Sequence, residues 1–70
     1  MERSAVQSKE IAVVGYEPET QKLEIVFRRG GVYHYTQVPK SVYDALMAAE
    51  SLGTYFEKNI KEVYSYEKVA

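Results

Sequence analysis

The chain has 70 residues and a mass of 8.0 kDa, which leaves room for one small domain. It contains no Cys, so disulfides cannot supplement its core, and seven Tyr with two Phe must supply much of the buried surface. Nine Lys and Arg against ten Asp and Glu give a net charge of −1, which excludes a uniformly basic surface for nucleic acid. No apolar run reaches the roughly 18 residues of a membrane helix. We find no recognisable signal peptide and expect a cytoplasmic protein without a membrane partner.

The first half of the chain carries the pattern of β-strands. Residues 11–17 are β-branched and almost continuously apolar, and turn residues at 18–21 end this strand. Residues 22–29 alternate between apolar and polar side chains, which is typical of a strand with one buried face. Gly30 and Gly31 supply the positive φ angles of a tight hairpin, and residues 32–38 return as the third strand. These patterns predict a three-stranded antiparallel meander.

The second half of the chain has helical spacing. Pro39 suits the first turn of a helix, so a helix is expected to begin within residues 39–42. Ser51 is a candidate N-cap for a second helix, whose apolar stripe contains Leu52, Phe56, Ile60 and Val63. Residues 64–69 are expected to be extended, and residues 1–8 to form a loose, flexible arm before the single domain of residues 9–70. The fold class is therefore α+β, a βββαα arrangement with two helices packed on one face of the sheet.

The length of the loop between the second and third strands decides where the central tyrosines point. With an even loop, Tyr33 and Tyr35 stand on the open face of the sheet, where they resemble the aromatic platforms of sheet-type RNA binders. With an odd loop they join Leu23 and Ile25 beneath the helices, and His34 is exposed near Glu24. We favour the odd loop because a chain this short gains more from burying two aromatic rings than from burying His and Thr.

The sequence offers no catalytic or metal-binding pattern. A zinc site of the usual ligand count is excluded by the single His and the absence of Cys, and we expect no cofactor. A Ser-His-Asp arrangement would depend on His34 alone, and no pattern places a nucleophile beside it. Gly30 and Gly31 lack the longer glycine framework and the following helix of a phosphate loop. We therefore predict that the protein is not an enzyme.

One group of residues combines positive charge with flat rings. Arg28 and Arg29 precede the hairpin glycines, and the run Tyr33-His34-Tyr35 follows them. Arg can hold phosphate while an aromatic ring stacks on an unpaired base, and Lys58 and Lys61 would extend a basic strip. The alternative interpretation is structural, because two Arg also keep a hairpin end solvated and protect a sheet edge from aggregation.

The order of these signals resembles the KTSC domain, a small domain of bacteria and phages found alone or at the C-terminus of some lysyl-tRNA synthetases. A central Tyr-x-Tyr is its marker, present here as Tyr33 and Tyr35, and the resemblance extends over roughly residues 8–69. The other matching signals are Val14-Gly15-Tyr16, Leu23-x-Ile25-x-Phe27, Gly30, Val38-Pro39, Val42-Tyr43, Ala49-x-Ser51-x-Gly53-x-Tyr55-Phe56, Ile60 and Tyr64-x-Tyr66. The chain departs from the family pattern at Glu57 and Lys61, where Asn and Arg are common.

The resemblance implies a non-catalytic binding module whose role in the family is unsettled. Attachment to synthetases favours RNA, including tRNA, as the ligand. The candidate RNA-contacting residues are Arg28, Arg29, Tyr33, His34, Tyr35, Lys58 and Lys61. The alternative is a protein-interaction or self-association module that uses an apolar open sheet face carrying Ile11, Val13 and Val26.

Overall fold

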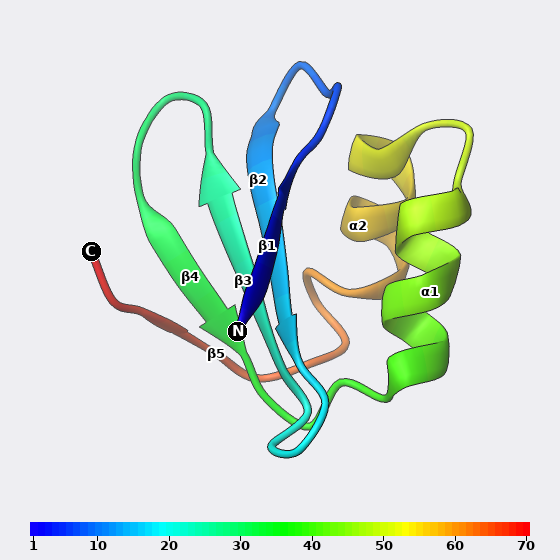
Figure 1. The fold of residues 1–70 in the computed structure, drawn as a ribbon. Coiled ribbons are helices and arrows are strands. Elements are labelled where there is room, and N and C mark those ends of the chain that lie inside the picture. The colour runs from blue at the N-terminus through cyan, green and yellow to red at the C-terminus, as the bar shows by residue number, and fades with distance from the viewer.

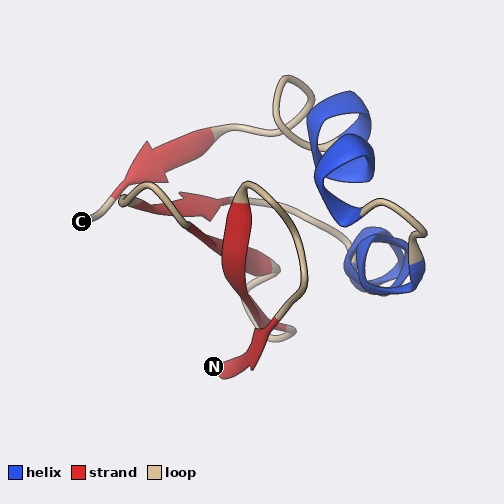
Figure 2. Cartoon of the chain, turned by 90° about the horizontal axis from the view of Figure 1, so that it is seen from above, coloured by secondary structure: helices blue, strands red, loops and turns tan.

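The computed structural model describes residues 1–70 and shows two helices on one face of a five-stranded antiparallel sheet (Figure 1). The strands are β1 (Glu2–Ala5), β2 (Ile11–Glu17), β3 (Lys22–Phe27), β4 (Val32–Tyr35) and β5 (Tyr66–Lys68), and the helices are α1 (Lys40–Ala48) and α2 (Leu52–Asn59). The spatial order of the strands follows their order in the chain, with both helices inserted between β4 and β5. Figure 2 shows the twist of the sheet and both helices on the same side of it. The α+β class with two helices on one face is confirmed.

The prediction of three strands is incomplete, because the sheet gains a strand at each edge. β1 lies within the segment that was expected to be a loose arm, and it pairs antiparallel with β2 so that Arg3 lies opposite Gly15. β5 pairs with β4 so that Tyr66 lies opposite Tyr35. Both edge strands are short and exposed along their whole length, so neither carries the apolar alternation by which a half-buried strand is recognised.

The hairpin between β3 and β4 has the odd loop. The amide of Phe27 donates to the carbonyl of Gly31, and both hairpin glycines have positive φ angles, 111° and 101°. Ile25 therefore lies opposite Tyr33, and Leu23 lies opposite Tyr35, on the face covered by the helices. Tyr35 is only 3% exposed, so the inward orientation is confirmed and the exposed platform of the even loop is wrong.

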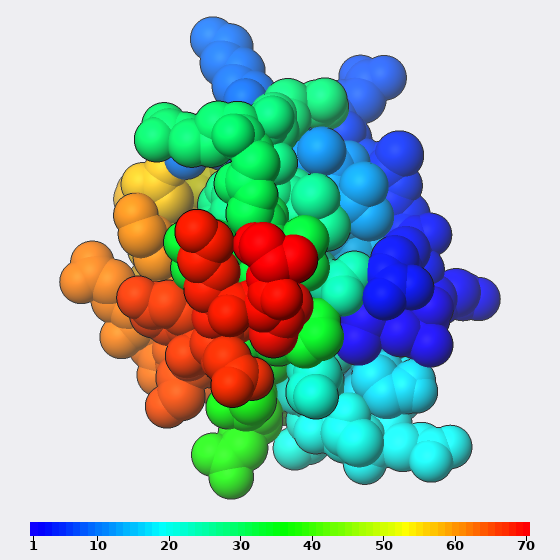
Figure 3. All heavy atoms as spheres, turned by 90° about the vertical axis from the view of Figure 1, so that its left-hand side faces the viewer, coloured from blue at the N-terminus to red at the C-terminus, as the bar shows by residue number.

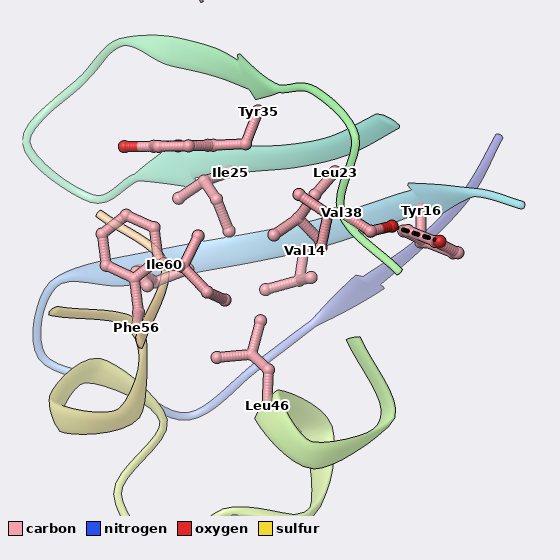
Figure 4. Close-up of a cluster of buried hydrophobic side chains, with 10 residues drawn as sticks. Val14, Tyr16, Leu23, Ile25, Tyr35, Val38, Leu46, Phe56 and Ile60 are labelled. Atoms are coloured by element: carbon pink, nitrogen blue, oxygen red, sulfur yellow. Dashed lines mark hydrogen bonds between the residues drawn. The ribbon is translucent and has the colours of Figure 1, made fainter. Parts of the chain in front are cut away.

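The core lies between this inner face of the sheet and the two helices (Figure 4). Side chains from β2 and β3 point toward Leu46 of α1 and Phe56 of α2 (Figure 4). The ten buried hydrophobic residues are Ile11, Val14, Tyr16, Leu23, Ile25, Tyr35, Val38, Leu46, Phe56 and Ile60. Ser51 caps α2 as expected, with its hydroxyl accepting from the amide of Thr54. Val63, predicted to continue the apolar stripe, is 63% exposed because α2 ends before it.

A bulge in β2 changes which residues lie on the open face of the sheet, so the expected set is wrong for Ile11. Ile11 pairs with Phe27 and Val13 with Val26, so one extra residue, Ala12, interrupts the alternation. The bulge turns Ile11 to the inner face, where it is fully buried in the core. The apolar patch proposed for a protein partner therefore loses Ile11, and Val13 and Val26 are themselves half-buried.

A charged group occupies the centre of the outer face, the side of the sheet that Figure 3 shows. Glu24 is only 5% exposed, and its carboxylate accepts hydrogen bonds from the Arg3 guanidinium. His34 Nε2 lies 2.8 Å from the same carboxylate, so the expected proximity of His34 and Glu24 is confirmed, although the His34 side chain is half-buried rather than exposed. Arg3 reaches Glu24 across Gly15, where an added Cβ would lie 3.0 Å from the Arg3 side chain. Gly15 thus leaves room for an ion pair that fixes β1 to the sheet.

We predict that this group makes folding sensitive to acid. The hydrogen bond from Arg3 lowers the pKa of Glu24 in the folded state, and His34 acts in the same direction against the effect of burial. The folded chain therefore binds fewer protons, so the stabilisation is present above the ordinary Glu pKa of about 4.3 and is lost as pH falls through the lower folded value. We expect Glu24→Gln to reduce the free energy of unfolding at neutral pH by about 1–3 kcal/mol and to flatten its decline in acid.

Urea unfolding at a series of pH values measures both effects, and Glu19→Gln, in the exposed turn between β2 and β3, is the matched control. Equal acid destabilisation of the wild type and Glu24→Gln would contradict this role of Glu24.

Candidate functional site

A groove of about 410 Å³ opens between α2 and the part of the sheet formed by β3, β4 and β5. Aromatic rings from the sheet and from α2 line it: Phe27, Tyr33, Tyr35, Phe56 and Tyr66. Charged side chains from the loop before β2, the β3–β4 hairpin and the end of α2 complete the lining: Glu10, Arg29, Glu57, Lys61 and Glu62. The groove therefore brings together segments that are distant in the sequence.

The rings of the groove pack edge to face and tilted against one another. Phe27 meets Tyr33 at 5.3 Å between ring centroids, and Tyr35 meets Phe56 at 5.4 Å, both in edge-to-face geometry. The ring of Tyr66 contacts both sheet tyrosines, with its centroid 5.6 Å from that of Tyr33 and 5.4 Å from that of Tyr35. Exposure increases along this cluster, from 3% at Tyr35 to 58% at Tyr66. The deep rings thus stabilise the fold, while the outer ring offers surface to a ligand.

The charged residues of the groove form a mixed set in which two carboxylates are close neighbours. Glu57 raises the pKa of Glu10, through a hydrogen bond between the two carboxyl groups and through their mutual repulsion. Lys61 and Arg29 act in the opposite direction, which places both cations near the same carboxyl group. The mouth of the groove thus presents hydrogen-bond acceptors and cations side by side.

The hydroxyl of Tyr35 stays protonated at the inner end of the groove. Burial raises the pKa of Tyr35 to about 12, and the neighbouring Tyr66 and Tyr33 add to the shift. At neutral pH the group is therefore an uncharged hydroxyl and supplies no nucleophilic phenolate.

The structure brings four of the seven predicted site residues together in the groove and places the other three elsewhere. Arg29, Tyr33, Tyr35 and Lys61 line the groove together. Arg28 donates from its guanidinium to the backbone carbonyls of Val6 and Ser8, so it holds the loop between β1 and β2. His34 lies on the opposite face of the sheet, and Lys58 is exposed on α2 outside the lining.

Sequence reasoning missed several residues of this site. Glu10, Glu57 and Glu62 are absent from the predicted site residues, because nothing in their spacing brings the start of β2 beside α2. Phe27 and Tyr66 are likewise absent from the predicted site residues, although both lie in the motifs Leu23-x-Ile25-x-Phe27 and Tyr64-x-Tyr66. The spacing of Tyr64 and Tyr66 was the available signal, because it places both side chains on one face of an extended segment.

A second hollow of about 530 Å³ lies near the N-terminus, between Tyr16, Tyr43 and Lys40. Its two tyrosine rings stack on each other at 4.7 Å, and the Tyr16 hydroxyl donates to the carbonyl of Val38. These contacts already occupy one face of each ring and the Tyr16 hydroxyl. No cluster of three or more His, Asp or Glu is placed to hold a metal ion, and neither helix is long and apolar enough to cross a bilayer.

The fold and sequence define a small α+β domain of a known family. The KTSC domain model matches residues 7–66, so the chain belongs to the KTSC family. In the crystal structure of a KTSC domain protein from Yersinia pestis, the chain has the same fold, with a TM-score of 0.95 and 36% identity over 99% of this chain and 97% of that one.

Relatives of known sequence fall into two kinds. An uncharacterised protein of Stutzerimonas stutzeri is 41% identical over 99% of both chains. A lysine–tRNA ligase of Nostoc sp. is 44% identical over 55 residues, which are 79% of this chain and 10% of the ligase. The domain therefore occurs both at the length of this chain and as a small part of a much larger protein.

We predict that Glu57→Gln lowers the pKa of Glu10 toward its ordinary value, because the substitution removes the like charge beside it. Titration of the side-chain carboxyl carbons by nuclear magnetic resonance measures this directly. Glu50→Gln, an exposed carboxylate after α1, is the control and should leave Glu10 unchanged. An unchanged Glu10 titration in Glu57→Gln would show that the two carboxylates do not share the mouth of the groove.

Proposed function

We propose that this KTSC domain is a non-catalytic module that binds single-stranded RNA. An unpaired base enters the aromatic groove, and the adjacent phosphates lie against Arg29 and Lys61. The observation that carries the proposal is that one groove combines the half-exposed ring of Tyr66 with these two cations. Stacking on an aromatic ring and ion pairing with the backbone are the two contributions that single-stranded RNA binders use.

The segments around the groove carry an excess of positive charge, although the lining itself has two cations, Arg29 and Lys61, against three carboxylates. Segments 8–10, 28–31 and 57–62 carry five cations, Lys9, Arg28, Arg29, Lys58 and Lys61, against three carboxylates, Glu10, Glu57 and Glu62. The remaining four cations and seven acids make the rest of the protein acidic. Phosphate would thus be attracted to these three segments, although the net charge of the whole chain is −1.

The relatives support RNA rather than another polyanion. Three similar proteins are named lysine–tRNA ligase, and the name identifies tRNA as a substrate of those proteins. The chain spans only a tenth of each, so the ligase reaction itself is not carried over to it. Binding of RNA is the property that a small appended domain and a separate protein could share.

We predict that Arg29→Gln and Lys61→Gln each weaken binding to fluorescein-labelled single-stranded RNA, with little dependence on sequence. Each lost phosphate contact should reduce the slope of log affinity against log salt concentration by about 0.7. Lys22→Gln, at the far end of β3 from the hairpin, is the matched control and should leave affinity and slope unchanged. Undetectable binding at low salt, or a slope that neither variant alters, would refute the proposal.

Tyr66 provides a separate test of the stacking contribution. Tyr66→Ala should cost about 1–3 kcal/mol of binding free energy, whereas Tyr66→Phe keeps the ring and should bind like the wild type. Circular dichroism melts establish that both variants retain the fold. Equal affinity of the folded Ala variant and the wild type would remove the groove from RNA binding.

A further inference from the structure

The carboxylates at the mouth of the groove are unexpected for a phosphate-binding surface, because a carboxylate repels phosphate. Glu10, Glu57 and Glu62 line the same groove, and Glu10 Oε1 would lie 3.8 Å from a Cβ added at Gly53, one helical turn before Glu57 on α2. An ionised carboxylate accepts hydrogen bonds and donates none. A ligand that fits this position must therefore present donors to it.

We propose that the groove selects guanine, whose Watson–Crick edge donates from N1 and N2 to the carboxylates of Glu10 and Glu57. This inference rests on the proposed RNA function and specifies which base enters the groove.

The chemistry of the four bases supports guanine alone. Guanine carries two adjacent N–H donors, which match two acceptor oxygens side by side, one from each carboxylate. Adenine and cytosine each have an amino group beside a ring nitrogen that is an acceptor, so one carboxylate oxygen would face a lone pair. Uracil has one N–H between two carbonyl oxygens. The three other bases therefore each bring an acceptor against the carboxylates.

The surroundings of the two carboxylates favour the same ligand. Glu10 and Glu57 line the groove as neighbouring carboxylates, and donors placed between two like charges reduce their mutual repulsion. The exposed ring of Tyr66 gives the base a surface to stack on. Arg29 and Lys61 line the same groove and are the cations available to phosphates of the bound strand.

Single-stranded oligouridines with one central position varied test the selection. Fluorescence polarisation at low salt compares guanine, adenine, cytosine, uracil and hypoxanthine at that position. We expect the guanine oligomer to bind about tenfold more tightly than the others. Hypoxanthine keeps the N1 donor but lacks the N2 amino group, so it should lose most of the preference.

Glu57→Gln and Glu10→Gln should lose the preference for guanine, because an amide presents a donor as well as an acceptor, and should bind the all-uridine oligomer at least as tightly as the wild type, because one carboxylate that repels phosphate is gone. Glu50→Gln, outside the groove, should keep the preference. Equal binding of all five oligomers by the wild type, or a preference that survives both groove substitutions, would overturn guanine selection and leave RNA binding intact.

Failure of the proposed function gives a different result. If no oligomer binds, and a lysine-rich peptide binds with an affinity that Glu57→Gln reduces, the groove recognises a cationic protein segment. That outcome would overturn both the RNA function and the guanine preference. Absence of binding to every oligomer overturns both as well, whatever the peptide does.

Discussion

The register of the β3–β4 hairpin is the constraint on which the rest of the structure depends. Because side chains alternate across a strand, a shift of one residue would exchange the inward tyrosines for His34 and Thr36. The observed register places Tyr35 in the core and His34 beside Glu24 on the outer face. One loop length therefore determines both the hydrophobic core and the buried charged group on the other side of the sheet.

The size of the chain explains why an aromatic groove exists at all. A domain of 70 residues buries a smaller fraction of its surface than a larger one, so rings at the edge of its core are covered only in part. Tyr35 lies under α2 and is shielded, whereas Tyr66 on the edge strand β5 keeps more than half of its surface exposed. The same aromatic cluster thus contributes to stability at one end and leaves an aromatic ring exposed at the other.

Local patterns in the sequence were sufficient for the central strands, the helices and the orientation of Tyr33 and Tyr35, since each depends on periodicity or on burial of large rings. Edge strands β1 and β5 carry no such pattern, because their stabilisation comes from backbone pairing to a partner strand. The Arg3–Glu24 pair joins residues 21 positions apart, and its prediction requires the register of three strands. The groove likewise needs the packing of α2 against the sheet, so only its cations and central tyrosines were identifiable beforehand.

Net charge alone is a poor guide to the ligand of this domain. A value of −1 conceals an excess of cations in segments 8–10, 28–31 and 57–62 and an excess of acids elsewhere, and the field near a surface follows the local distribution. Carboxylates within a cationic region reduce its attraction for phosphate, and two neighbouring carboxylates also repel each other. Their presence at the mouth of an aromatic groove is therefore unfavourable for a ligand that offers only phosphate. It becomes favourable when the same ligand also donates hydrogen bonds to them, which links the charge of the groove to the chemistry of the base inside it.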